Sequence, residues 1–253
     1  MARVELDIKP ATPGQLSRRC GGDVFGRTIK SILKSGVRDL KNKISKVDED
    51  EEFATPFGLR IGAAVDIDTL PMRMHAADLH IELPQETMII AAQGYIDLGD
   101  SAYAHRYYTS DDTMIQVLTV GGMEEQHVEE LTLFVPYKSF YPDTDGAWAQ
   151  WTAEGGRLGA QLFRLDDGTE YRRIWFDTDE GYAKPVKFTE SVYEDPDSDE
   201  CSEVFHTVML YGRNLEEGTK NEYLLVSVES YEGEKTVELM VGVDLEFSNL
   251  NVI

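Results

Sequence analysis

From Phe57 to its end, the chain is a succession of short segments rich in Val, Ile, Tyr, Phe and Thr, each followed closely by turn residues. Short, closely spaced segments of this composition are typical of strands in an antiparallel β fold. The sequence therefore predicts a mainly β protein. The expected strands are 59–67, 88–97, 104–108, 114–120, 130–136, 161–165, 170–176, 186–193, 204–211, 222–228 and 236–243.

Turn residues join several of these segments into hairpins. Asp166-Asp167-Gly168 contains an Asp-Gly pair, which favours a tight turn between two strands. The hairpins joined at 109–112 and 216–218 resemble each other, because each has a His-bearing aromatic strand, an acidic turn and an apolar strand. This likeness predicts that the β region contains two similar units.

The expected architecture is mainly β, a β-rich α+β fold. It consists of two similar antiparallel β modules, small barrels or rolls, over 53–145 and 146–253, preceded by an N-terminal amphipathic helix. Short helices are expected within 70–79 and 146–151. In the second of these, Trp148 and Trp151 lie one helical turn apart and are interpreted as packing residues.

Charge is distributed very unevenly along the chain. The whole chain has a net charge of -23, but residues 1–47 hold eleven basic and four acidic residues, a net charge of +7. The remaining body therefore carries -30. Because nucleic-acid binding depends on Lys and Arg neutralising phosphates, we expect no nucleic-acid partner for this body.

The basic residues belong to an N-terminal arm, residues 1–52, which ends in the acidic run 48–52. Asp23 is a suitable N-cap for an amphipathic helix over 24–47, and the acidic run is interpreted as a linker. One side of this helix is apolar and the other is basic. The apolar side holds Phe25, Ile29, Ile32, Leu33, Val37, Leu40, Ile44 and Val47, and the basic side holds Arg27, Lys30, Lys34, Arg38 and Lys41.

Three interpretations of the arm stay open. Its apolar side can pack on the chain's own acidic body. It can lie on an anionic membrane surface, which attracts Lys and Arg while the apolar side is buried among the lipids. It can also dock on a helical protein partner. In all three, the arm is an attachment device and not a catalytic site.

The search for catalytic chemistry finds no catalytic residues. The five histidines form no motif, and Cys20 and Cys201 are too isolated for a disulfide framework or a zinc site. We expect no metal and no cofactor, and the sequence favours a non-enzymatic protein over an enzyme. The candidate pocket, between the two modules, is formed by His105, Arg106, Tyr108 and His206.

The sequence shows neither a signal peptide nor an apolar run long enough to cross a bilayer. We therefore expect a cytoplasmic protein, with a peripheral position at the inner face of the membrane if the arm binds lipid.

A string of segments in order resembles one known family. They are FGLRIGAAVDIDTLP, GYIDLGD, HRYYTSDDTMIQVLTVGG, EEQHVEELTLFVPYKSFYP, YRRIWF, PVKFTESVYED, EYLLVSVE and VGVDL. Over about 56–253 the chain is similar to the YjfK-like family of bacterial proteins of unknown function. The resemblance supplies no catalytic residues. It implies a setting of envelope stress or membrane maintenance, with a phage-shock-type coiled-coil protein as partner.

The leading hypothesis is a non-enzymatic cytoplasmic adaptor. Its acidic body would bind a protein partner, and its arm would dock on a membrane face or a helical partner. The first alternative is a small-molecule-binding or hydrolytic domain with a site between the two modules. The second alternative is an acidic protein that mimics nucleic acid.

Overall fold

The computed structural model describes residues 56–74, 77–84, 87–176, 179–216 and 220–253. The predicted arm, including the helix over 24–47, lies outside the described residues. The strands are β1 (Ala64–Ile67), β2 (Met88–Gly99), β3 (Ala102–Thr109), β4 (Met114–Val120), β5 (Val128–Phe140), β6 (Leu162–Arg164), β7 (Glu170–Arg173), β8 (Val186–Tyr193), β9 (Ser202–Glu216), β10 (Lys220–Tyr231), β11 (Glu234–Asp244) and β12 (Leu250–Val252). The α-helices are α2 (Leu70–Arg73) and α3 (Asp145–Thr152), and the short 3-10 helices are η1 (Pro56–Gly58), η2 (Glu125–His127) and η3 (Phe247–Asn249).

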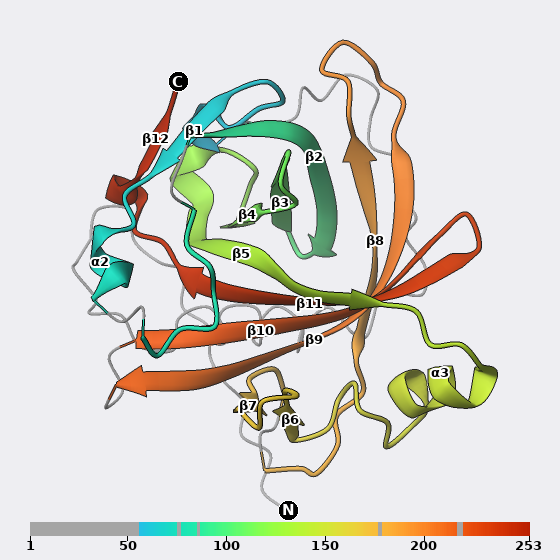
Figure 1. Ribbon diagram of the computed structural model, residues 1–253. Coiled ribbons are helices and arrows are strands. Elements are labelled where there is room, and N and C mark those ends of the chain that lie inside the picture. The colour runs from blue at the N-terminus through green and yellow to red at the C-terminus, as the bar shows by residue number, and fades with distance from the viewer. Residues whose placement is uncertain (1–55, 75–76, 85–86, 177–178, 217–219) are drawn as a thin grey trace, which may run out of the picture.

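The central feature is a closed antiparallel barrel of eight strands (Figure 1). The order runs β2-β3-β4-β5-β11-β10-β9-β8, and β8 pairs with β2 to close it. Pairing β5 with β11 and β8 with β2 joins the two predicted modules, and each contributes four strands to the same barrel. The prediction of two separate modules is therefore not confirmed, whereas the mainly β fold is.

The remaining elements lie outside the barrel. β1 and β12 pair with each other beside the start of β2, and β6 and β7 extend the sheet from β9. The predicted helices within 70–79 and 146–151 are found as α2 and α3, and every expected strand overlaps an observed one. β12 was not expected. Among the described residues, no helix is both long enough and apolar enough to cross a membrane.

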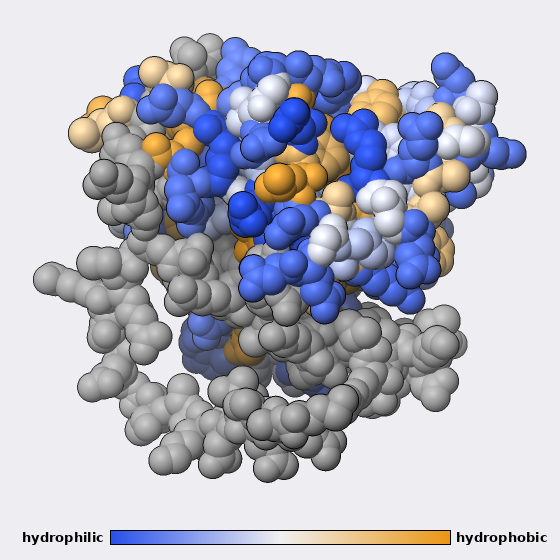
Figure 2. Space-filling model, turned by 90° about the horizontal axis from the view of Figure 1, so that it is seen from below, coloured by the Kyte–Doolittle hydropathy of each residue, from blue (hydrophilic) through white to orange (hydrophobic). Residues whose placement is uncertain are grey.

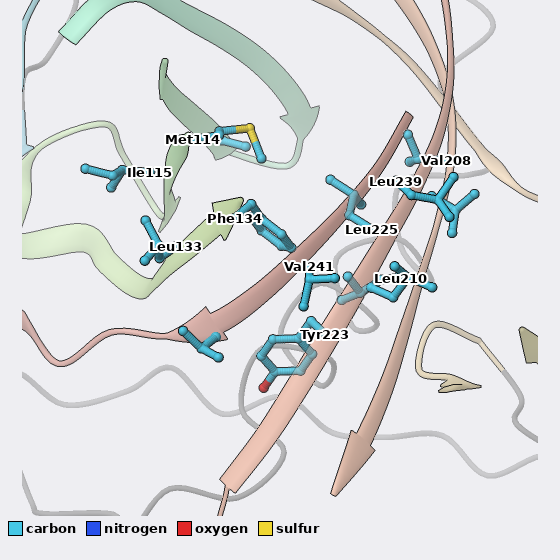
Figure 3. Packing of buried hydrophobic residues seen from close by; sticks show 14 of the residues in the cluster. Met114, Ile115, Leu133, Phe134, Val208, Leu210, Tyr223, Leu225, Leu239 and Val241 are labelled. Atoms are coloured by element: carbon cyan, nitrogen blue, oxygen red, sulfur yellow. The ribbon is translucent and has the colours of Figure 1, made fainter. Parts of the chain in front are cut away.

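Alternation along the strands sends one set of side chains inward and the other outward. A chain of close contacts runs from Arg106 on β3 through Glu190 and His206 to Glu229 on β10, the strand opposite β3 in the barrel, so these side chains point into the interior. Figure 3 shows buried side chains that project from β4, β5, β9, β10 and β11, among them Phe134, Leu210 and Tyr223. Most of these side chains are completely buried, so the interior is filled.

Elements outside the barrel cover part of its outer surface. The rings of Tyr211 on β9 and Phe163 on β6 pack at a tilt with their centroids 5.3 Å apart, and Phe163 in turn contacts Trp151 of α3 at 6.1 Å. Trp151 is buried and also contacts Phe140 at the end of β5, at 5.2 Å between ring centroids. Aromatic packing therefore holds α3 and β6 against the barrel.

Candidate functional site

Polar side chains meet inside the barrel around one carboxylate, that of Glu190 on β8. We call Arg106, Tyr108, Glu190 and His206 the interior cluster. Arg106 Nη1 donates to Glu190 Oε2 at 2.7 Å, and the Tyr108 hydroxyl donates to Oε1 at 2.8 Å. His206 Nε2 lies 2.9 Å from Oε2. The side chains of three strands, β3, β8 and β9, are thereby connected through a single buried anion.

Neighbouring residues hold the Arg106 guanidinium and the His206 ring in place. Gln116 of β4 accepts from Arg106 Nε at 3.0 Å, and Ser227 of β10 lies 3.1 Å from His206 Nδ1. The Phe188 ring stacks on His206 at 5.1 Å and lies 5.4 Å from the Arg106 guanidinium carbon. The charges of the cluster are therefore paired as well as buried, as buried charges must be.

The pairing decides the protonation of Glu190. Burial by itself raises the pKa of the carboxyl, but the Arg106 charge and the contacts with His206 and Tyr108 outweigh it and lower the pKa to about 2. For Tyr108, burial and the Glu190 charge both raise the pKa. At neutral pH Glu190 is an anion and Tyr108 is a neutral donor. A carboxylate with so low a pKa is a poor general base, so the cluster is suited to holding strands together.

The structure brings together three of the four residues of the predicted pocket, namely Arg106, Tyr108 and His206. The fourth, His105, points to the outer face of β3, because neighbouring residues of a strand alternate between faces. There His105 Nε2 lies 3.4 Å from Thr119 Oγ1, and burial lowers the pKa of His105 to about 4. Sequence reasoning missed Glu190, whose signal was a lone carboxylate in an otherwise uncharged stretch of β8, FTESVY.

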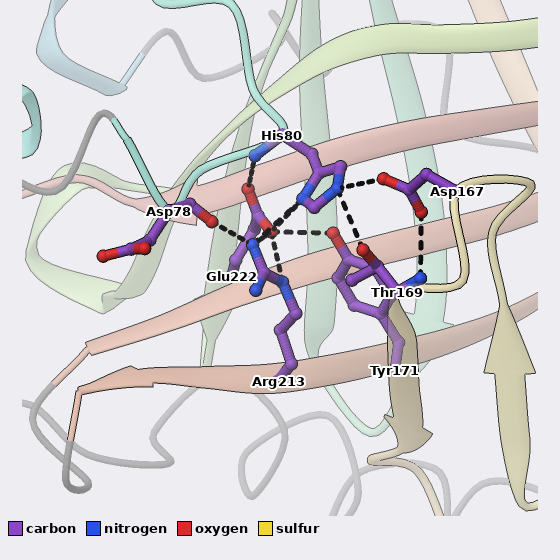
Figure 4. Close-up of polar contacts among 7 residues, drawn as sticks. All are labelled: Asp78, His80, Asp167, Thr169, Tyr171, Arg213 and Glu222. Carbon is purple, nitrogen blue, oxygen red and sulfur yellow. Dashed lines mark hydrogen bonds and ion pairs between the residues drawn. The ribbon is translucent and has the colours of Figure 1, made fainter.

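A second polar network lies on the outer surface of the barrel (Figure 4). We call His80, Asp167, Tyr171, Arg213 and Glu222 the outer cluster. The Glu222 carboxylate is completely buried and accepts three hydrogen bonds, from the His80 backbone at 2.5 Å, the Tyr171 hydroxyl at 2.7 Å and Arg213 Nε at 2.7 Å. Because these residues come from β7, β9, β10 and the segment before β2, the network fastens that segment to the barrel.

The ring of His80 has partners at both nitrogens. Nε2 lies 2.7 Å from Asp167 Oδ2 and 3.1 Å from Thr169 Oγ1, and Nδ1 lies 3.0 Å from Arg213 Nη2. A guanidinium only donates, so Nδ1 accepts and Nε2 carries the hydrogen that it donates to Asp167. A hydrogen bond from the Thr169 backbone and the contact with His80 lower the pKa of Asp167 to about 2. An Asp–His pair orients the base of many hydrolases, but here the second nitrogen meets a guanidinium and not a nucleophile.

A surface hollow lies between α3 and the turn that joins β10 to β11. Its volume is about 550 Å³, and Tyr141, Trp148, Gly233 and Lys235 are among its lining residues. We call it the α3 hollow. Tyr141 is 63% exposed, and Trp148 is half-buried. The interpretation of both tryptophans as packing residues is confirmed, because Trp151 is buried in the hydrophobic core and the half-buried Trp148 packs against that core. Within the described residues, no group of three or more His, Cys, Asp and Glu side chains is placed to hold a metal ion.

Comparisons with known proteins place the chain in a family. Residues 39–251 match the family described as "Protein of unknown function (DUF2491)". The chain belongs to the DUF2491 family. It is also similar to the "Uncharacterized protein YjfK" of Escherichia coli (strain K12), at 29% identity over 202 residues, which cover 78% of this chain and 90% of that protein. No solved structure matches it.

The DUF2491 match confirms the YjfK-like resemblance and extends it. It begins at residue 39, whereas the resemblance found in the sequence began at about 56. The family region therefore includes the last part of the predicted arm helix. Leu40 and Ile44 of its apolar side and Lys41 of its basic side fall within the DUF2491 region.

The interior cluster predicts how the stability of this DUF2491 protein depends on pH. The pKa of Glu190 is about 2 in the folded chain, below its ordinary value of 4.5. Its contribution to the free energy of unfolding is therefore complete above about pH 4.5 and is lost as the pH falls towards 2. Urea unfolding at pH 7, 4.5 and 3 should show that the free energy of unfolding falls less with decreasing pH in Glu190→Gln than in the unchanged protein. Parallel declines would contradict the assignment.

Proposed function

We propose that the chain is a non-enzymatic adaptor that binds a basic, partly apolar segment of a protein partner at the α3 hollow. The observation that carries the proposal is an aromatic surface surrounded by carboxylates. Tyr141 and Trp148 supply aromatic area, which is enriched in protein interfaces. Acidic side chains lie exposed beside them: Asp143, Asp145, Glu232 and Glu234.

A further exposed aromatic side chain, that of Phe205, lies near the hollow on the outer face of the barrel. Lys235, which lines the hollow, is opposite Ser230 of β10, and Ser230 is opposite Phe205 of β9. Neighbouring strands lie about 4.8 Å apart, so Phe205 is about 10 Å from Lys235. Phe205 is 60% exposed. A partner segment that covers both Tyr141 and Phe205 would bury two large aromatic side chains.

The charge of the body favours a basic partner. The body, residues 48–253, carries a net charge of -30. Its electric field attracts segments rich in Lys and Arg and repels acidic segments as they approach. A phage-shock-type coiled-coil protein and an anionic membrane stay predictions for the whole chain. Binding to an anionic membrane would use the basic arm and not the α3 hollow. Membrane binding and peptide binding at the hollow can therefore be separated experimentally.

The test is the binding of labelled synthetic peptides to the full chain by fluorescence anisotropy. The probe is a peptide that alternates Lys or Arg with Leu and Trp, and a peptide with Glu in place of each basic residue is its control. We expect the basic peptide to bind, and Tyr141→Ala and Trp148→Ala each to weaken binding about 10-fold. Leu162→Ala removes an exposed apolar side chain on β6 and should change nothing. Equal affinity in all variants, or no binding, would overturn the proposal.

A further inference from the structure

An exposed apolar surface lies where the described chain begins. It consists of Phe57 of η1, Leu70 of α2, Met74 directly after α2 and Phe247 of η3, and we call it the entry patch. Leu70 is 67% exposed, Met74 83% and Phe247 43%. Seen from below, hydrophobic atoms reach the surface at the left of Figure 2, the side on which α2 lies in Figure 1.

Defined contacts hold the parts of the entry patch together. The rings of Phe57 and Phe247 stack with their centroids 5.0 Å apart. Asp68 joins α2 to η3, because its backbone N–H donates to the Asn249 carbonyl at 2.8 Å while its Oδ1 accepts from the Leu70 backbone at 3.0 Å. The ring stack and these hydrogen bonds hold η1, η3 and the start of α2 beside one another, and exposed apolar side chains gathered in one region are typical of an interaction site.

The chain itself supplies a segment suited to this surface. Residues 1–55 precede Pro56, and within them the predicted helix over 24–47 has an apolar side and a net positive charge. The surroundings of the entry patch carry the carboxylates of Asp66, Asp68, Glu125 and Glu246, against the basic side chains of Arg60 and Arg73. Charge complementarity thus favours the arm over an acidic segment.

The linker is long enough for the predicted helix to reach the entry patch. Residues 48–55 connect the predicted helix to Pro56, and eight residues span up to about 27 Å when extended. Phe57 is itself part of the entry patch, so the helix is tethered beside the surface. Tethering gives such a contact an effective concentration in the millimolar range, far above that of a separate partner.

We propose that the predicted helix over 24–47 packs its apolar side on the entry patch of its own chain. Leu40, Ile44 and Val47, near the end of the helix, are the apolar side chains closest along the chain to the entry patch. The basic side then faces outward, where it can meet an anionic leaflet or an acidic partner. This contact is independent of the α3 hollow, since the entry patch shares no residue with the lining of the hollow.

The test is hydrogen exchange of backbone amides in the full chain. We expect amides of 25–47 to be protected, and Leu70→Ser combined with Met74→Ser to speed their exchange about 10-fold. Leu40→Ser should have the same effect from the other side of the contact. Leu162→Ser, an exposed substitution on β6, is the matched control, and unchanged protection of β10 and β11 shows that the barrel is folded.

Three outcomes would overturn the proposal. Exchange of 25–47 at the rate of an unprotected peptide would mean that the arm is free in the isolated chain, as expected if it waits for a membrane or a partner helix. Protection that persists in the Leu70→Ser/Met74→Ser variant would mean that the arm packs elsewhere. Protection that depends on protein concentration would mean that a second copy covers the entry patch.

Discussion

Arg106→Met is expected to lower the free energy of unfolding by about 3–5 kcal/mol, because it leaves the Glu190 carboxylate buried without its principal counter-charge. Glu190 is completely buried, and Arg106 is only 4% exposed, so water cannot replace the lost partner. The measurement is urea unfolding at pH 7, with intrinsic fluorescence as the signal. His206 remains beside the carboxylate, at 2.9 Å from Glu190 Oε2, but it does not replace the permanent charge of Arg106, which lies 2.7 Å from the same oxygen.

A second substitution distinguishes charge pairing from packing. Replacing both partners, Arg106→Met with Glu190→Leu, removes the buried anion together with its cation and should recover most of the loss, since apolar pairs of similar volume substitute well for buried ion pairs. Arg164→Met is the matched control, because Arg164 and Glu170 form an ion pair at the exposed surface and its loss should be hardly measurable. A double variant as unstable as Arg106→Met would show that shape, and not charge, governs the site.

The strands could be predicted because their signal is local. β4 and β10 are dense in Val, Ile and Leu, and turn residues stand beside them, so composition and spacing suffice to find them. Their partners could not be found in the same way. β2 and β8 pair to close the barrel although about ninety residues separate them. The sequence of neither strand indicates which distant strand it pairs with.

The same limit applies to the two polar clusters. Alternation along β3 predicts that Arg106 and Tyr108 share a face, and that His105 lies on the other. It cannot reveal that Glu190 lies between them and His206, since that depends on how β8 is placed beside β2. In the outer cluster, His80, Asp167 and Glu222 meet from three separate parts of the chain, so no motif existed to be recognised. β12 was missed because a strand of three residues carries too little pattern.

Gly94→Ala is expected to destabilise the barrel by about 3 kcal/mol, because the new methyl group would occupy the place of the Glu190 carboxylate. Gly94 lies on β2, opposite Arg106 on one side and Val192 of β8 on the other. A Cβ at this position would lie 1.7 Å from Glu190 Oε1 and 2.8 Å from its Cδ, distances that no rotation of the methyl can relieve. The carboxylate must move, and its hydrogen bonds with Arg106 and Tyr108 are lost with it.

The origin of this loss can be isolated with a double-mutant cycle, measured by urea unfolding at pH 7. In a Glu190→Ala background the carboxylate is absent, so the Gly94 methyl meets no obstacle and should cost less than about 1 kcal/mol. Gly146→Ala is the control, since a Cβ there meets nothing within 4 Å, and alanine in place of glycine in α3 should be neutral or slightly stabilising. If the losses of stability from Gly94→Ala and Glu190→Ala instead simply add, the methyl group disturbs the strand itself. Glycine at residue 94 would then be needed for the bend of β2 and not to leave room for the Glu190 carboxylate.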